Sequence, residues 1–134
     1  MSVFANESLP FMKVVVATAT RNATAAIGML VTAQTDLRLV GEAADLTELL
    51  VLVKSHRPDV IVLHWDAFGD RIDQLHQLLE LIETSPAIVA LSVNDQLRDQ
   101  AIANGVTQFA HMGSPPTKLL EAIRQTDSSG NPHN

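Results

Sequence analysis

Short apolar runs alternate with longer amphipathic segments along most of the chain. The apolar runs cover residues 13–19, 37–44, 59–64, 87–92 and 106–112. Short runs that contain many β-branched residues are typical of strands. We therefore predict five strands.

Between and after these runs, apolar residues recur at every third or fourth position. Such spacing places them on one face of a helix and predicts amphipathic helices. The predicted helices cover residues 21–33, 45–56, 70–84, 94–105 and 114–125. Strand and helix thus alternate five times.

Capping residues stand at several of the predicted helix ends. Asp45 is placed to cap the second helix, and Glu48 three residues later completes a capping box. Gly105 ends the fourth helix, as glycine often does. Pro115 and Pro116 stand in the first turn of the last helix, where a missing N–H costs nothing.

Five strand–helix units in series predict an α/β fold, a parallel sheet with helices on both faces. The unbroken apolar strands indicate a sheet that is buried on both sides. Crossover connections are right-handed almost without exception. The number and length of the units fit the doubly wound, flavodoxin-like fold with strand order 2-1-3-4-5, in which ligands bind at the carboxyl ends of strands 1 and 3.

The length of 134 residues allows one domain. We assign residues 1–11 to an N-terminal arm, with an extra strand as the alternative, and residues 12–125 to the domain. Residues 126–134 are polar and contain glycine, which predicts a disordered C-terminal tail.

Charge and composition exclude several classes of function. The formal charge is −6, with 9 Lys and Arg against 15 Asp and Glu, so a basic surface for nucleic acid is not expected. The absence of cysteine removes disulfides and thiolate chemistry. No apolar run approaches the roughly 18–20 residues of a membrane span, and no secretion signal is evident, so we expect a cytoplasmic protein.

Polar residues follow two of the buried strands directly. His64 and Asp66 come at the end of the third strand, and Ser92 ends the fourth. Ser92 lacks the surrounding motif of a nucleophile elbow, the five histidines show no metal-ligand spacing, and the segment "ATATRNAT" contains no glycine for a phosphate loop. We therefore predict that the chain is not an enzyme and holds no cofactor and no metal.

Six phrases in the right order and spacing carry a family resemblance: "MKVVVA", "LRLVGEAAD", "RPDVIVL", "AIVALS", "ANGVTQFAHM" and "SPPTKLLEAI". Over residues 12–125 the chain resembles the CheY-like receiver domain of bacterial two-component response regulators. "VGEAAD" and "PPTKLLEAI" are most similar to receivers that precede a helix-turn-helix DNA-binding domain.

The resemblance implies a set of phosphorylation groups that this chain mostly lacks. A receiver carries an acceptor aspartate after strand 3, an acidic pair for Mg²⁺ after strand 1, a hydroxyl after strand 4 and a lysine after strand 5. By position, the acceptor falls on His64, the acidic pair on Thr18 and Ala19, the hydroxyl on Ser92 and the lysine on Met112. The resemblance therefore implies a degenerate receiver.

Several of these residues have two interpretations. His64 is either a structural imidazole or a phosphoryl or metal site with Asp66 and His111. Asp66 replaces the acceptor only if the loop shifts by two residues. Trp65 either fills the vacated pocket or presents an exposed contact.

Other positions have a structural interpretation that is sufficient. Phe109, at the family's aromatic switch position, is either a switch or a space-filling residue. Met112 fills the core or the pocket, and Thr18 and Thr20 cap the first helix.

Our leading hypothesis is a pseudo-receiver that transmits signals by protein–protein contact, independently of phosphorylation. The resemblance implies that partners bind the surface formed by residues 94–125. It also implies a homodimer, through that surface or through the helices at 21–33 and 114–125.

Three alternatives stay open. The chain is the receiver half of a helix-turn-helix regulator whose DNA-binding domain is absent from this chain. It is a small-ligand sensor or enzyme that uses the pocket around Thr18, His64, Ser92 and His111. Or it is still phosphorylated, on Asp66 or His64.

Overall fold

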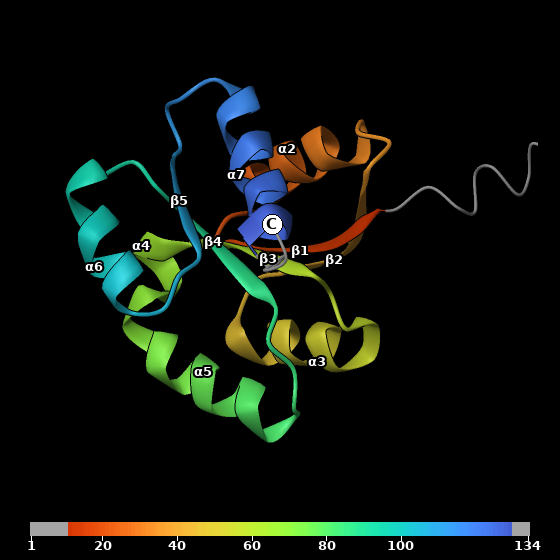
Figure 1. Ribbon diagram of the computed structural model, residues 1–134, viewed down its shortest axis with the longest axis vertical. Helices are drawn as coiled ribbons and strands as arrows, with labels where there is room; N and C mark the ends of the chain where they lie inside the picture. Colours follow the sequence, from red (N-terminus) through yellow and green to blue (C-terminus); the bar gives the residue numbers. More distant parts are fainter. Residues whose placement is uncertain (1–10, 130–134) are drawn as a thin grey trace, which may run out of the picture.

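A five-stranded parallel sheet forms the centre of the computed structural model, which describes residues 11–129 (Figure 1). The strand order is β2-β1-β3-β4-β5, which confirms the predicted doubly wound fold. The strands are β1 (Met12–Ala17), β2 (Leu37–Ala43), β3 (Val60–His64), β4 (Ala87–Ser92) and β5 (Gln108–His111). They lie close to the predicted ranges, although β5 is shorter at both ends.

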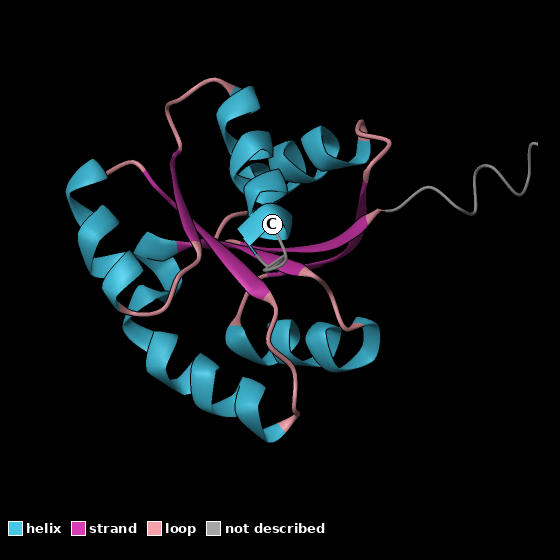
Figure 2. Ribbon diagram, in the orientation of Figure 1, coloured by secondary structure: helices cyan, strands magenta, loops and turns pink. Residues whose placement is uncertain are grey.

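Helices cover both faces of the sheet (Figures 1 and 2). Helices α2 (Arg21–Thr32) and α7 (Pro116–Ser129) pack on one face. The other face is covered by α3 (Leu46–His56), α4 (Trp65–Phe68), α5 (Ile72–Leu81) and α6 (Arg98–Ala103). Within residues 11–129, no helix combines the length and the hydrophobicity needed to cross a membrane.

Strand β3 lies in the middle of the sheet and contributes to two hydrophobic cores. Because side chains alternate along a strand, Ile61 and Leu63 enter the core under α3, α4 and α5, and Val60 and Val62 enter the core under α2 and α7. All four side chains are fully buried. This explains why the strand is an unbroken apolar run.

The predicted caps at Asp45 and Gly105 are confirmed. The Asp45 carboxylate accepts a hydrogen bond from the Glu48 N–H at 2.8 Å, and Glu48 Oε1 accepts one from the Ala44 N–H at 2.7 Å. Gly105 follows α6 with φ of +92°. Its N–H donates to the Ile102 carbonyl, and the Val106 N–H donates to the Ala101 carbonyl, which closes the helix end.

The predicted helix over residues 70–84 is wrong at its start. The chain becomes helical at Trp65, directly after β3, passes through a 3₁₀ turn η1 (Gly69–Arg71), and continues as α5. The aromatic side chains of Trp65 and Phe68 are buried one helical turn apart, and this burial stabilises a helix of four residues. A similar 3₁₀ turn, η2 (Asp95–Leu97), precedes α6.

The predicted end of the last helix is also wrong. Helix α7 continues to Ser129, so residues 126–129 do not belong to a disordered tail. The Thr126 side chain is buried, and its hydroxyl donates to the Ile123 carbonyl at 2.6 Å. The predicted arm over residues 1–11, apart from Phe11, and the remaining tail, 130–134, lie outside the described residues.

Arg124 ties α7 to the turn between α2 and β2. Its Nε donates to Asp36 Oδ2 at 2.8 Å and its Nη2 to Asp36 Oδ1 at 2.9 Å. The hydrogen bond from the Arg124 guanidinium lowers the pKa of Asp36, and the same bond raises the pKa of Arg124. The pair lies at the amino-terminal ends of the strands, whereas the candidate site lies at their carboxyl ends.

Candidate functional site

Three of the residues singled out in the sequence meet at the carboxyl ends of β3 and β4. The Ser92 hydroxyl faces both carboxylate oxygens of Asp66, at 2.9 Å and 3.1 Å, and donates its proton to them. It accepts a hydrogen bond from the Asn94 N–H at 2.9 Å. Ser92 is fully buried, whereas the Asp66 side chain is 34% exposed.

His64 completes this cluster. Its Nε2 lies 3.4 Å from Asp66 Oδ2, an ion pair when the imidazole is protonated. The His64 Nδ1 is buried and finds no hydrogen-bond partner among the described residues. A buried nitrogen without a partner is unfavourable. The position of the ring is set instead by the end of β3, where His64 lies, and by the Asp66 carboxylate beside it.

The early start of α4 is what carries Asp66 to Ser92. Trp65 and Phe68 point into the core and anchor the short helix. Gly69 allows the tight turn that follows, because a Cβ at this position would lie 2.7 Å from Trp65 Cε2. The Asp66 carboxylate, on this short helix, therefore faces Ser92.

Thr18 and Ala19, which follow β1, bring no charge to the cluster. Thr18 is buried, and its hydroxyl donates to the Thr20 carbonyl at 2.8 Å and contacts the Thr24 hydroxyl. Thr20 caps α2, its hydroxyl accepting from the Ala23 N–H at 3.3 Å. Ala19 is exposed and lines a cavity of about 240 Å³ beside α3 and α4.

His111 and Met112 turn to other neighbours. His111 Nε2 donates to the Val93 carbonyl at 2.8 Å, and its Nδ1 accepts from the Gly113 N–H at 2.9 Å. A carbonyl only accepts and an N–H only donates, so these bonds require the neutral ring protonated on Nε2. The Met112 side chain lines the groove between α2 and α7.

The two aromatic residues are both part of the core. Trp65 is 4% exposed, so the interpretation as an exposed contact is wrong, and the space-filling interpretation is the one that its burial supports. Phe109 is 6% exposed and lies under the Arg98 guanidinium, whose Cζ is 4.8 Å from the ring centroid. Arg98 was not singled out from the sequence, because no local pattern pairs it with Phe109.

The cluster therefore offers one carboxylate, one hydroxyl and one imidazole. Among the side chains that the structure describes, no Lys or Arg pairs with Asp66. The same residues contain no group of three His, Asp or Glu side chains that could hold a metal ion. The pocket proposed around Thr18, His64, Ser92 and His111 is not assembled by these contacts, because Thr18 and His111 are engaged elsewhere.

Solved structures of receiver domains share this fold. The signal receiver domain of the response regulator NarL from Mycobacterium tuberculosis matches with a TM-score of 0.74 and 22% identity, over 89% of this chain and 98% of that one. A LuxR-family two-component response regulator from Aurantimonas matches with a TM-score of 0.76 and 17% identity, over 89% and 86%.

RcsB from Salmonella enterica serovar Typhimurium, solved bound to the promoter rprA, matches with a TM-score of 0.73 and 19% identity. This match covers 88% of our chain and 61% of RcsB. By sequence, neither a protein-family model nor a curated protein matches the chain. The likeness to these structures establishes the receiver fold.

Proposed function

We propose that this chain is a receiver-type signalling domain that acts by protein–protein contact and is not phosphorylated at the end of β3. The observation that carries the proposal is the chemistry at the carboxyl ends of the strands. His64 ends β3, Thr18 and Ala19 follow β1, and Met112 follows β5. The receiver fold supports the signalling role, and these residues support its independence from phosphate.

The argument rests on charge. Phosphoryl transfer depends on positioning and on positive charge that neutralises the transferred oxygens. The side chains at these positions are an imidazole, a hydroxyl, a methyl and a thioether, which provide neither a fixed cation nor a carboxylate pair for Mg²⁺. Asp66 is already held by Ser92 and faces His64.

The surface formed by α6, β5 and α7 is a suitable place for a partner. It contains a groove of about 550 Å³ with charged residues of both signs. Asp95 pairs with Arg98 at 3.4 Å, and Lys118 with Glu121 at 3.9 Å. An ordinary receiver is shifted between two states by its phosphate; here a partner would set the population by binding one state more tightly.

The direct test is incubation with acetyl phosphate and Mg²⁺, followed by intact mass measurement. We expect no species heavier by one phosphoryl group, while a phosphorylatable receiver treated in parallel gains it. The His64→Asp variant is a matched control. It restores the acceptor alone, and we expect it to stay unmodified because the metal ligands and the lysine are still missing.

A stable phosphorylated species of the unaltered chain would refute the proposal. Two variants would then identify the phosphorylated residue. Loss of the species in Asp66→Asn with retention in His64→Gln identifies Asp66, and the reverse pattern identifies His64.

Phosphorylation of Asp66 is the second candidate that a specific observation favours. The hydrogen bonds from Ser92 place this carboxylate beside the hydroxyl at the end of β4. In a receiver, such a hydroxyl bonds the phosphoryl oxygens. The mass experiment distinguishes the two candidates directly.

A third candidate is the receiver part of a DNA-binding regulator. It is suggested by RcsB, which was solved on its promoter and of which this chain covers 61%. The charge of −6 disfavours DNA binding by this chain itself. Sequencing the transcript beyond the codon for Asn134 would decide whether a further domain follows.

A further inference from the structure

The His111 side chain connects two loops at the carboxyl ends of β4 and β5. Its Nε2–H donates to the carbonyl of Val93, in the loop after β4, at 2.8 Å. Its Nδ1 accepts from the N–H of Gly113, in the turn after β5, at 2.9 Å. The Ser114 N–H donates to the His111 carbonyl at 3.1 Å, so residues 111–114 form a tight turn that leads to α7.

The ring lies directly against the backbone of Gly113. A Cβ at this position would lie 2.8 Å from His111 Cε1 and 3.1 Å from His111 Nδ1, closer than a side chain can normally approach. Glycine therefore allows the turn to close on the imidazole. Because the fit is so close, the turn is sensitive to any change at Nδ1.

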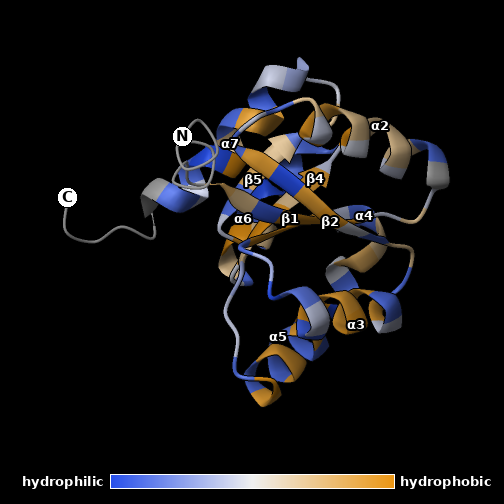
Figure 3. Ribbon diagram, turned by 90° about the vertical axis from the view of Figure 1, so that its right-hand side faces the viewer, coloured by the Kyte–Doolittle hydropathy of each residue, from blue (hydrophilic) through white to orange (hydrophobic). Residues whose placement is uncertain are grey.

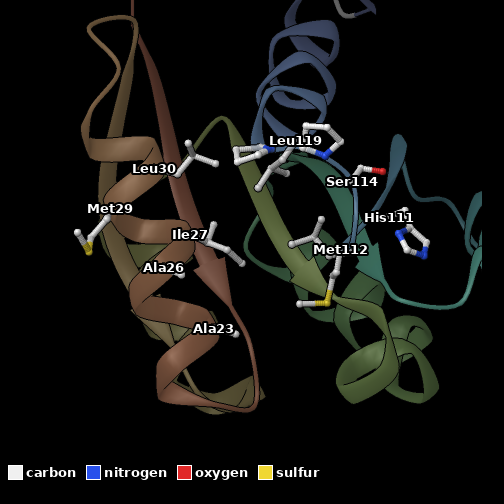
Figure 4. A pocket seen from close by; sticks show the side chains of 12 residues that line it. Ala23, Ala26, Ile27, Met29, Leu30, His111, Met112, Ser114 and Leu119 are labelled. Carbon is white, nitrogen blue, oxygen red and sulfur yellow. The ribbon is translucent and has the colours of Figure 1, made fainter.

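His111 lies between two grooves. It lines an apolar groove of about 540 Å³ between α2 and α7, and also the groove of about 550 Å³ on the α6–β5–α7 surface. Figure 4 shows the Met112 side chain pointing toward α2 and the His111 ring on the opposite side, away from α2. Ser114, in the same turn, also lines both grooves. A movement of the turn therefore changes both surfaces.

No charged group approaches the ring from α2. After its first residue this helix contains no ionisable residue, and in Figure 3 its ribbon is mainly tan and orange. Among the described residues that line the apolar groove, His111 is the only one that ionises. On the side of β4, Ser92 precedes Val93 and leads to Asp66 and His64, which face each other at 3.4 Å.

The charges on the α6–β5–α7 side are paired. Asp95 and Arg98 approach each other at 3.4 Å, and Lys118 and Glu121 at 3.9 Å. These four residues line the same groove as His111. Since each carboxylate there has a cation beside it, the two hydrogen bonds of the ring determine how a proton on His111 affects the turn.

Protonation of His111 competes with the hydrogen bond from Gly113. In the neutral ring the Nδ1 lone pair accepts from the Gly113 N–H. A second proton binds to this same lone pair, because Nε2 already carries one. The Gly113 N–H then faces another N–H and loses its acceptor, whereas the bond from Nε2 to the Val93 carbonyl persists.

The turn can open without unfolding the domain. Gly113 and Val93 are exposed and His111 is half-buried, so the released N–H bonds to water instead. An imidazole changes its charge between about pH 5 and pH 8. The competition at Nδ1 thus falls in the range that a cell experiences.

We propose that His111 is a pH-dependent switch, which holds the turn at residues 111–114 closed while its ring is neutral and opens the turn when its ring is protonated. The turn is closed above the titration range of the ring and open below it. The inference rests on the proposed function, because the turn borders the α6–β5–α7 surface on which we place the partner. A proton then shifts this surface between two states, in place of a phosphate.

Nuclear magnetic resonance of the whole chain, without a partner, tests the proposal. Between about pH 8 and pH 5 we expect the Gly113 and Ser114 amide signals to shift with the same midpoint as the His111 ring signal. The protection of the Gly113 amide against hydrogen exchange, corrected for the intrinsic pH dependence of exchange, should fall at least about tenfold. A ring with only a structural role would titrate without this loss of protection.

Two variants of His111 fix the turn in one state each. His111→Asn replaces Nδ1 by an amide oxygen, which accepts a hydrogen bond but does not titrate, so Gly113 should be protected at both pH values. His111→Lys carries a fixed charge and no acceptor, so Gly113 should be unprotected at both. The matched control is His64→Gln, which removes the imidazole at the end of β3 and should leave the Gly113 transition unchanged. Circular dichroism verifies that each variant is folded.

The inference is wrong if Gly113 keeps its protection down to about pH 5 in the unaltered chain. It is also wrong if His111→Asn retains the pH-dependent loss, or if His64→Gln abolishes it, which would assign the transition to the His64 cluster. These outcomes are independent of phosphorylation. A turn that ignores pH in a chain that accepts no phosphoryl group leaves the proposed function standing, and a turn that opens in a chain that accepts one refutes only the proposed function.

Discussion

At the scale of single residues, Ser92 determines the geometry of the candidate site. It is the fully buried end of β4, and its hydroxyl connects the Asp66 carboxylate to the Asn94 backbone. These hydrogen bonds predict a structural contribution of Ser92 to stability.

We predict that Ser92→Ala lowers the free energy of unfolding by about 1–3 kcal/mol, because the Asn94 N–H and Asp66 lose their partner. Urea denaturation monitored by circular dichroism measures the loss. Ser85→Ala is the control, since Ser85 is exposed, and should change the stability by less than about 0.5 kcal/mol. Equal effects of the two substitutions would show that the Ser92 bonds contribute nothing.

The sequence placed His64, Asp66 and Ser92 in one pocket at the carboxyl ends of the strands but did not predict the contact between Asp66 and Ser92. Ser92 and Asp66 are 26 positions apart, and their contact depends on where α4 begins. Periodicity is read over 11 or more residues, so a four-residue helix anchored only by Trp65 and Phe68 leaves no readable pattern. The hydrogen bond of the Thr18 hydroxyl could not be predicted either, because its acceptor is positioned by the local backbone path.

At the scale of elements, the strands and helix ends were predictable where the cause is local. Asp45 with Glu48, and Gly105 after α6, act through neighbouring backbone groups, and both caps were found correctly. The end of α7 was missed because "TDSS" has low helix propensity. Burial of Thr126 overrides that propensity, and burial is a tertiary effect.

The contact of α7 with the α2–β2 turn gives a pH-dependent prediction. The Arg124 guanidinium lowers the pKa of Asp36 below its ordinary value of 3.8. A carboxyl with a lowered pKa in the folded state stabilises the protein above the unfolded value, and the effect is lost as the pH falls through the folded pKa. The contribution should thus be complete at neutral pH, begin to fall near pH 3.8 and be lost as the pH passes below the lowered pKa of the folded state.

Arg124→Gln tests this contact. We expect the variant to be less stable by about 0.5–1 kcal/mol at pH 7, since exposed ion pairs contribute little, and the difference to vanish in acid. Urea midpoints measured between pH 7 and pH 3 follow the change. Arg124→Lys is the control, because it keeps the charge without the bidentate geometry. Its stability should lie between that of the unaltered chain and that of Arg124→Gln. A difference that is independent of pH would assign the effect to packing.

At the scale of the whole molecule, one sheet separates two cores that share the same strands. Along β3, Val62 belongs to the core under α2 and α7, and Leu63 to the core under α3, α4 and α5. Neither core persists if the sheet between them dissolves, so we expect both to unfold in one cooperative transition.

The chain contains a single tryptophan, which allows this cooperativity to be measured. Trp65 lies in the α3–α4–α5 core, so its fluorescence reports that side alone, whereas far-ultraviolet circular dichroism reports the whole fold. We predict that Val62→Ala, in the opposite core, lowers the stability by about 2 kcal/mol and shifts the urea transitions seen by both probes equally. Val51→Ala is the control, because Val51 is 59% exposed and should shift neither transition by much. If the circular dichroism transition moved while the Trp65 transition stayed in place, the two faces of the sheet would unfold independently.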